Sequence, residues 1–567
     1  MNFSRSFLFV SMLAICLACG TKKQAADLII FGGKIYTMDE GLPVAKAVAV
    51  TGEKIVFVGE EEDARTFISD GTRVIDLKGN VMTPGFIEGH GHIMEIGYNE
   101  MELDLRAVKS YEELVEKVRQ AVAKAEPGQW ITGRGWHQDK WDHPPRKTVK
   151  GFQTHQLLSA VSPDNPVFLS HASGHAALAN ARAMEMAGVN QLSLEKIPNI
   201  AGDGGEIIRD EMGNPTGIFN EEAMGIIAAH IPENTTATDT RALKLALDAC
   251  ARNGITGFHD AGAARQSIEL FREFRKSNQL TVRLYVMVAG LSLAREWFLQ
   301  GPMIDEDHLL TIRSVKLSCD GALGSRGAWL LDAYSDRPDF YGMATISMDT
   351  VLAISRAALK RGFQVCAHAI GDRANREVLD MYEIALKENP NISDHRFRIE
   401  HAQHLHPQDI PRFANLGVIP AMQAIHMSSD RPWAVERLGE KRIKEGAYMW
   451  QSLLKTGARI VNGTDAPVEP LNPIPSFYAS VTRKTLNATP ERGYEPGEKM
   501  TREQALRSYT LDAAFGAFQD KVLGSIEVGK YADFAVLSKD IMTVAESEIL
   551  ATDIVLTIMG GKVVFER

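Results

Sequence analysis

Short apolar segments alternate with amphipathic, helix-like segments along the middle of the chain. The apolar segments are nearly continuous, which is typical of parallel strands covered on both faces. Stretches such as 349–361 and 373–388 have the spacing of helices that cover such a sheet. Eight strand-and-helix units of this kind predict an α/β fold, a (β/α)8 TIM barrel. The predicted strands are 86–93, 254–263, 282–290, 313–322, 363–372, 396–405, 418–427 and 458–467.

The two ends of the chain carry a different pattern, in which short alternating segments are separated by glycine turns. Residues 27–60 contain this pattern, and residues 531–567 repeat it. We therefore predict a β-sandwich domain that is built from both termini, residues 19–84 and 517–567. It frames a barrel domain of residues 85–516.

One long segment, residues 95–235, separates the first predicted strand of the barrel from the helix near 237–252 and does not follow the alternation of strands and helices. A connection of this length is too long to be a bare loop in a compact domain. It is predicted to fold as an inserted cap over the mouth of the barrel.

The N-terminus has the composition of a targeting segment. Arg5 precedes an apolar stretch that is shorter than the ~20 residues of a membrane-spanning helix. The sequence around Cys19, LACG, resembles a bacterial lipoprotein cleavage box. Residues 1–18 are thus predicted to be a signal peptide, and a lipid anchor at Cys19 would be the only attachment to a membrane. A plain secretory signal is the alternative, and both place the protein outside the cytoplasm, in the bacterial periplasm or at the outer membrane.

Composition and charge exclude several classes of function. The 567 residues are 45% hydrophobic and 24% charged, as in globular proteins rather than disordered ones. The formal net charge of −10 disfavours nucleic-acid binding, which needs a basic face. Beyond the N-terminus, Cys250, Cys319 and Cys366 lie in apolar surroundings and are expected to be buried thiols.

Polar residues typical of metal sites lie at the carboxyl ends of the predicted strands, where barrel enzymes place their chemistry. His90 and His92 are two apart on a strand, so their imidazoles point to the same side. Taken singly, these histidines are also typical of hydrogen-bonded structural residues, His368 and His401 above all. Together, the four histidines and the aspartate predict a site for one or two Zn²⁺ ions, because imidazole and carboxylate are its usual ligands. The candidates are His90, His92, Lys316, His368, His401 and Asp465.

Five sequence motifs contain the candidate ligands: 84–92 (PGFIEGHGH), 315–325 (VKLSCDGALGS), 366–375 (CAHAIGDRAN), 398–403 (RIEHAQ) and 462–470 (NGTDAPVEP). In this order they resemble the motifs of the amidohydrolase superfamily, in the branch that contains N-substituted formamide deformylase. The resemblance covers nearly all of the chain after the N-terminal segment, including residues 524–537 near the C-terminus.

The resemblance implies roles for these residues. His90 and His92, with Asp465, would bind the more buried metal, and His368 and His401 the more exposed one. Asp465 would accept a proton from the attacking water and pass it to the leaving nitrogen. The implied reaction is the hydrolysis of an amide or N-formyl C–N bond in a small molecule by a metal-activated hydroxide.

Lys316 occupies the place of a bridging lysine that is carboxylated to a carbamate in this family. An ion pair of Lys316 with Asp320 or Asp465 is the alternative. The number of metals, one or two, stays open.

Five further residues are candidates for binding the substrate. Trp136 and Trp141 are expected to stack on an apolar group, or else to pack inside the cap. His175 resembles a recurrent histidine that faces the active site in this branch, or it braces a turn. Asp320 and Arg326 would orient the substrate or brace the loop after Lys316.

Two other functions fit the same residues. A lactonase or esterase would use the same metal centre, and assays on amides, N-formyl amines and lactones separate these activities. A non-catalytic exported binding protein would be expected to have lost a ligand or the base, yet all six positions are occupied. The sequence is also compatible with a homo-oligomer.

Overall fold

The computed structural model describes residues 25–138, 141–171, 176–189 and 206–567. The predicted signal peptide, Cys19 and His175 lie outside the described residues. Within these ranges, none of the helices combines the length and the apolar content that crossing a bilayer requires.

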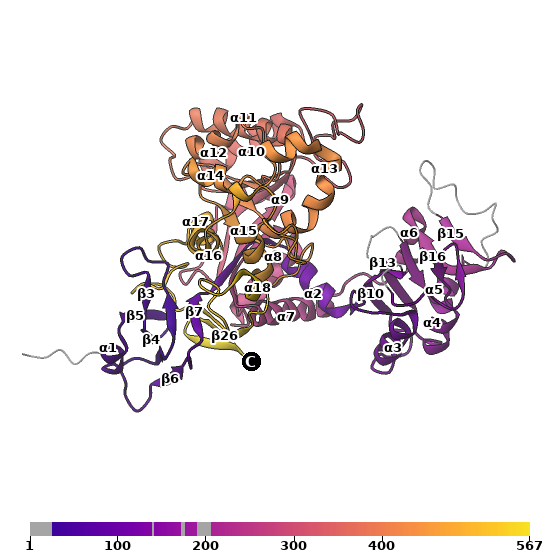
Figure 1. Ribbon diagram of the computed structural model, residues 1–567, viewed down its shortest axis with the longest axis horizontal. Coiled ribbons are helices and arrows are strands. Elements are labelled where there is room, and N and C mark those ends of the chain that lie inside the picture. The colour runs from indigo at the N-terminus through magenta and orange to yellow at the C-terminus, as the bar shows by residue number, and fades with distance from the viewer. Residues whose placement is uncertain (1–24, 139–140, 172–175, 190–205) are drawn as a thin grey trace, which may run out of the picture.

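Eight parallel strands form a nearly closed barrel at the centre of the molecule, which confirms the predicted (β/α)8 fold (Figure 1). The first and last strands are joined through the backbone amide of Asp465, which donates to the carbonyl of His90 at 2.8 Å. The buried carboxylate of Glu88 adds hydrogen bonds from the amide and hydroxyl of Thr464 at 2.7 and 2.8 Å. In sheet order, the strands are β8 (Phe86–Gly91), β17 (Ile255–Ala263), β18 (Arg283–Ala289), β20 (Leu310–Ser318), β21 (Gln364–Ala369), β22 (Arg398–His401), β23 (Ile419–Met422) and β24 (Val461–Asn462).

Helices cover the outside of this barrel, and their apolar faces form one large core with the strands. The predicted strand 418–427 is wrong in its second half. After β23, Gln423 is still extended, and a helix begins at Ala424, whose amide donates to the side chain of Asn462. The helices of the barrel and its C-terminal extension are α2 (Ile93–Met101), α7 (Thr236–Arg252), α8 (Arg265–Lys276), α9 (Leu291–Gln300), α10 (Met348–Arg361), α11 (Asp372–Lys387), α12 (Ile410–Leu416), α13 (Ala424–Gly446), α14 (Trp450–Lys455), α15 (Pro473–Thr482), α16 (Arg502–Ser508), α17 (Leu511–Gly516) and α18 (Glu546–Ile549).

Both ends of the chain contribute to a pair of sheets beside the barrel. One sheet has the order β5-β4-β1-β6, and the other, β27-β26-β25-β7-β2-β3, combines N-terminal and C-terminal strands. Apolar side chains such as Val48, Phe534 and Ile558 form the core that these strands share. The strands are β1 (Leu28–Phe31), β2 (Lys34–Tyr36), β3 (Val44–Ala45), β4 (Ala47–Thr51), β5 (Lys54–Gly59), β6 (Arg73–Asp76), β7 (Val81–Pro84), β25 (Phe534–Leu537), β26 (Ile554–Met559) and β27 (Lys562–Glu566), and α1 is Glu61–Arg65.

A buried ion pair connects the barrel to this sandwich. Arg283 of β18 donates to Asp533 at 2.7 Å, and only 1% of the arginine and 8% of the aspartate side chain are exposed. Asp533 also accepts the backbone amide of Gly560 at 2.7 Å. Loss of the Asp533 carboxylate therefore leaves two buried donors, the Arg283 side chain and the Gly560 amide, without this acceptor.

Asp533→Ala is expected to destabilise the protein by about 3–5 kcal/mol, the usual cost of removing one partner of a buried pair. The measurement is thermal or urea-induced unfolding. Asp553→Ala, which removes the exposed Asp553–Arg567 pair of the same sandwich, is the control and should change stability by less than about 1 kcal/mol. Equal effects of the two variants would contradict a structural role for the Arg283–Asp533 pair.

The insert folds as a separate α/β lobe at the right of Figure 1, joined to the barrel through α2 and α7. Its sheet has the order β15-β16-β14-β13-β10-β9 and its own apolar cores. In this arrangement it projects to the side and meets the barrel at its root, so its role as a cover over the mouth stays a prediction. Its elements are β9 (Leu103–Asp104), α3 (Tyr111–Val122), β10 (Ile131–Trp136), β11 (Thr148–Val149), β12 (Phe152–Gln153), α4 (Gln156–Val161), β13 (Val167–His171), β14 (Ala176–Ala179), α5 (Ala181–Met186), β15 (Glu206–Arg209), β16 (Pro215–Asn220) and α6 (Met224–Ala228).

Candidate metal centre

Three of the predicted ligands meet at the carboxyl ends of the barrel strands. One side-chain nitrogen each of His90 and His401 and one carboxylate oxygen of Asp465 all lie within 4.8 Å of one another. They come from β8, from the end of β22 and from the loop after β24, and all three residues are buried. A cluster of this kind, assembled from distant parts of the sequence, has the donors that a divalent cation prefers.

The orientation of His90 is fixed by a carboxylate behind it. Nδ1 of His90 is hydrogen-bonded to Glu400, whose carboxylate also accepts from Nε and Nη2 of Arg398 at 2.8 and 2.9 Å. Burial opposes ionisation of Glu400, but Arg398 and His90 outweigh it and hold the pKa of Glu400 below its usual range. With Nδ1 engaged, Nε2 of His90 is left to face the cluster, as in metal sites where a carboxylate orients the liganding histidine.

His401 is oriented in the same way by Gln423. Its Nδ1 lies 2.7 Å from the Gln423 side-chain oxygen, which leaves Nε2 on the side of the cluster. His401 and Asp465 also adopt left-handed backbone conformations, with φ of 75° and 58°. Non-glycine residues rarely adopt this conformation, and such strain persists where the surroundings impose it, often at functional sites.

Asp465 lies between several histidines. Its Oδ1 atom is 3.2 Å from Nε2 of His92 and 3.5 Å from Nε2 of His90. Burial would raise the pKa of Asp465, but the contact with His92 and the charge of the surrounding histidines hold it well below its usual range. The group is therefore an ionised carboxylate at neutral pH.

His368 and Lys316 complete the set of predicted ligands. The ring centroids of His368 and His401 are 4.5 Å apart, and Nζ of Lys316 lies 3.3 Å from Nε2 of His90. Burial lowers the pKa of Lys316. Lys316 forms no ion pair with either carboxylate that was named as its alternative partner, as far as the described residues show.

The side chains present fit a divalent cation. Within the described residues, Nε2 of His368 and Oδ1 of Asp465 are buried and make no hydrogen bond, although Oδ1 of Asp320 lies 3.3 Å from the first and Nε2 of His92 lies 3.2 Å from the second. Leaving such atoms unsatisfied is costly, and a cation that accepts nitrogen and oxygen ligands would satisfy both. His90, His401 and Asp465 would be its first ligands, with His92, His368 and Lys316 close by.

Comparison with known proteins agrees with this geometry. The profile of the amidohydrolase family matches residues 73–565. This chain belongs to the amidohydrolase family. It is 33% identical over 550 residues to the protein LONG AFTER FAR-RED 3 of Arabidopsis thaliana, covering 95% of this chain and 91% of that protein. It is 28% identical over 558 residues to the N-substituted formamide deformylase of Arthrobacter pascens, covering 96% and 99%.

A solved structure extends the likeness to the fold. An uncharacterised metal-dependent hydrolase from Pyrococcus horikoshii superposes with a TM-score of 0.72 at 28% identity, and the match covers 92% of this chain and 99% of that one. This amidohydrolase is therefore a hydrolase of a metal-dependent family, and its candidate metal ligands lie at the carboxyl ends of the barrel strands, where such enzymes place their chemistry.

Two of the residues predicted to bind substrate are core residues of the insert. Trp136 is fully buried, and its indole N–H donates to the carbonyl of Leu169 at 2.9 Å. Trp141 is 8% exposed and stacks on Tyr111 with ring centroids 6.1 Å apart. Both fit the packing alternative, since neither ring is open to a ligand at the barrel mouth.

Asp320 and Arg326 of this amidohydrolase both brace loops. Asp320 is buried and accepts the backbone amides of Ile370 and Gly371 at 3.0 and 2.8 Å, which holds the loop after β21 beside His368. Arg326 is hydrogen-bonded through two nitrogens to Asp336. Their contacts fit the loop-bracing alternative, and a direct contact with substrate stays a prediction for them, as it does for His175.

Trp136→Ala is expected to destabilise the insert by about 3–5 kcal/mol through loss of a large core side chain, and to leave metal content unchanged. Unfolding is followed by thermal denaturation and limited proteolysis, and metal by elemental analysis. An unchanged stability together with a raised KM would contradict the packing role and restore the substrate role.

Three residues that the sequence analysis did not single out belong to the site: Glu400, Gln423 and His426. Glu400 precedes His401 in the RIEHAQ motif, so a carboxylate next to a liganding histidine was a signal that could have been used. Gln423 and His426 lie in the stretch that was predicted to be all strand. The turn into α13 after β23 places both side chains at the cluster.

A charged cleft of about 340 Å³ lies between the root of the insert and the loop that follows Asp465. Arg134 of β10 and Glu102 line it from the insert, and Glu469 lines it from the barrel. Its volume is in the range of small-molecule sites.

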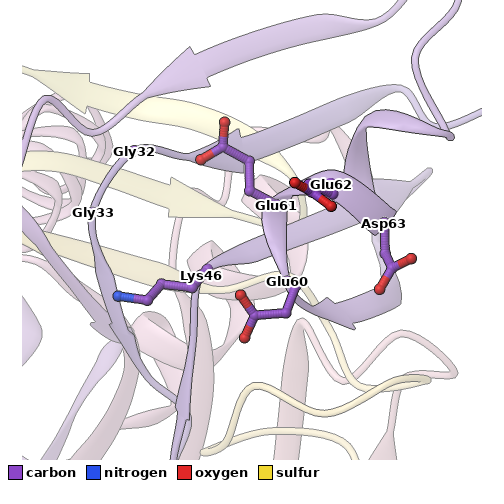
Figure 2. A pocket seen from close by; sticks show the side chains of 7 residues that line it. All are labelled: Gly32, Gly33, Lys46, Glu60, Glu61, Glu62 and Asp63. Carbon is purple, nitrogen blue, oxygen red and sulfur yellow. The ribbon is translucent and has the colours of Figure 1, made fainter.

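A larger hollow, of about 740 Å³, lies on the sandwich and is lined by Lys46, two glycines and the acidic residues 60–63. Figure 2 shows these carboxylates pointing in different directions rather than toward one point. Three of them occupy the first turn of α1, where negative charge is favourable at the positive end of a helix dipole. The hollow holds no residue of the metal centre.

Proposed function

We propose that this amidohydrolase cleaves a C–N bond, of amide or N-formyl type, in a small molecule, with Zn²⁺ as its cofactor. The observation that carries the proposal is the cluster of His90, His401 and Asp465, with each histidine oriented by a hydrogen bond from behind. The similarity to an N-substituted formamide deformylase supports the choice of the bond.

The donor set indicates which residues would hold the metal and what it would supply. His90, His92, His368, His401 and Asp465 offer nitrogen and oxygen ligands from four strand ends, which suits Zn²⁺. When bound, such a cation lowers the pKa of a coordinated water and polarises a carbonyl group.

The remaining steps belong to side chains of the protein. Asp465 is ionised and faces the cluster, so it can accept the proton of the attacking water and deliver it to the nitrogen of the leaving amine. Water attack then yields a carboxylic acid and an amine. Glu400 and Gln423 keep their histidines in one orientation throughout.

Lys316 is proposed to be carboxylated, which would give it the oxygen atoms of a carbamate as ligands for the metal site. Its burial lowers its pKa, which favours the neutral amine that reacts with CO₂. Lys316→Ala is expected to hold less metal and to lose most activity, and a short carboxylate such as formate should restore part of both. Unchanged metal content and activity would leave Lys316 as a structural residue.

The function is tested by incubating zinc-loaded protein with a panel of N-formyl amines, simple amides and lactones, and by measuring the amine and the acid released. The Asp465→Asn variant, purified by the same procedure, serves as the control for contaminating activity. Hydrolysis of an N-formyl amine or amide by the wild type alone supports the proposal. Cleavage confined to lactones favours an esterase on the same centre, and no hydrolysis at all favours a binding protein.

A further inference from the structure

His426 lies beside the metal centre but is not among its predicted ligands. It is the third residue of α13, directly after the turn that follows β23, and it is 9% exposed. Its ring stacks on that of His401, with centroids 6.1 Å apart and planes 18° apart. Its Nε2 atom lies 3.9 Å from Oδ2 of Asp465.

The two carboxylate oxygens of Asp465 face different neighbours. Oδ1 faces the Nε2 atoms of His92 and His90, at 3.2 and 3.5 Å, whereas Oδ2 faces His426. Asp465 therefore separates His426 from these two predicted ligands. A group in this place lies next to the proton acceptor, where the atoms of a substrate would be.

Nε2 of His426 is buried and makes no hydrogen bond to any of the described residues. A buried polar nitrogen without a partner is costly, and such atoms are rare unless a ligand or water satisfies them. Asp430 and Glu469 also lie nearby, but their hydrogen bonds come from the side chains of Gln403 and Ser429 and not from His426. The unsatisfied atom thus points to a partner that arrives with the substrate.

We propose that His426 is a further catalytic residue, whose Nε2–H donates a hydrogen bond to the substrate oxygen that gains negative charge during hydrolysis. No bond is made or broken at His426, and no proton leaves it. Donors aimed at developing charge in a buried site are worth about 10²–10³ in kcat. The inference rests on the proposed function for its substrate, and its donor can also be tested without turnover.

The test compares zinc-loaded wild type with His426→Ala and His426→Gln. His395→Gln is a matched control, since His395 is also buried but bonds the carbonyl of Leu416 away from the cluster. Zinc is measured by elemental analysis. Binding of methylphosphonate, a tetrahedral oxyanion, is measured by calorimetry, and kcat and KM are measured on any substrate that the panel identifies.

We expect unchanged zinc in all variants and at least a tenfold weaker binding of methylphosphonate to His426→Ala. Glutamine should recover part of the binding because its amide can donate, and His395→Gln should match the wild type. On a substrate, His426→Ala should lower kcat more than it raises KM.

Three results would overturn the inference: loss of a zinc equivalent in His426→Ala, which would make His426 a ligand; methylphosphonate binding equal to that of the wild type; or no binding to the wild type itself. Failure of the proposed function is a separate result. If the wild type hydrolyses nothing but binds methylphosphonate in a His426-dependent way, the donor stands and the C–N hydrolase assignment falls.

Discussion

Asp465→Asn is expected to lower kcat by about 10²–10⁴ and to keep most of the bound zinc. The asparagine has nearly the same shape and retains one oxygen toward the cluster, but its amide cannot accept the proton of the attacking water. The measurement pairs steady-state kinetics on the substrate identified by the panel with elemental analysis of the same protein.

Asp512→Asn provides a matched control for this variant. Asp512 is a buried carboxylate at the start of α17 that interacts with Arg507 and takes no part in the cluster. Its variant should retain activity within about twofold. Activity of Asp465→Asn close to that of Asp512→Asn would remove Asp465 as the proton carrier.

Glu400→Gln is expected to weaken zinc binding by about 10–100-fold, the usual effect of removing a carboxylate that orients a liganding histidine. The glutamine leaves the charge of buried Arg398 uncompensated and weakens the hold on Nδ1 of His90. Competition with a chelator of known affinity measures the change.

Glu498→Gln is the control for this second variant, because Glu498 is also a hydrogen-bonded carboxylate, with two bonds from Ser452, but lies outside the metal centre. Its zinc affinity should equal that of the wild type. An unchanged affinity in Glu400→Gln would show that the pair of His90 with Glu400 serves the fold alone.

The barrel and the cluster of His90, His401 and Asp465 could be predicted from the sequence because the patterns that indicate them are local. Continuous apolar strands occur at regular intervals, and each candidate ligand lies near or just after the carboxyl end of one of them. In a parallel barrel all such ends meet at one rim. His90, His401 and Asp465 come together there for this reason.

The surroundings of the cluster could not be predicted in the same way. Glu400 is 310 residues from His90, and nothing in the sequence pairs them. His426 was placed on a strand because the apolar pattern of 418–427 continues into the first turn of α13, where helix and strand patterns are hard to separate. For Trp136 both a substrate contact and packing inside the insert stayed open, because the pattern could not tell an exposed ring from a core one.

The metal centre is tested most directly by anomalous diffraction at the zinc edge from crystals of the zinc-loaded protein. If His90, His401 and Asp465 hold the metal, an anomalous peak is expected within about 2.0–2.3 Å of a side-chain nitrogen of each histidine and of a carboxylate oxygen of Asp465. A peak elsewhere in the molecule, or no peak among these residues at full zinc loading, would contradict this assignment of the ligands.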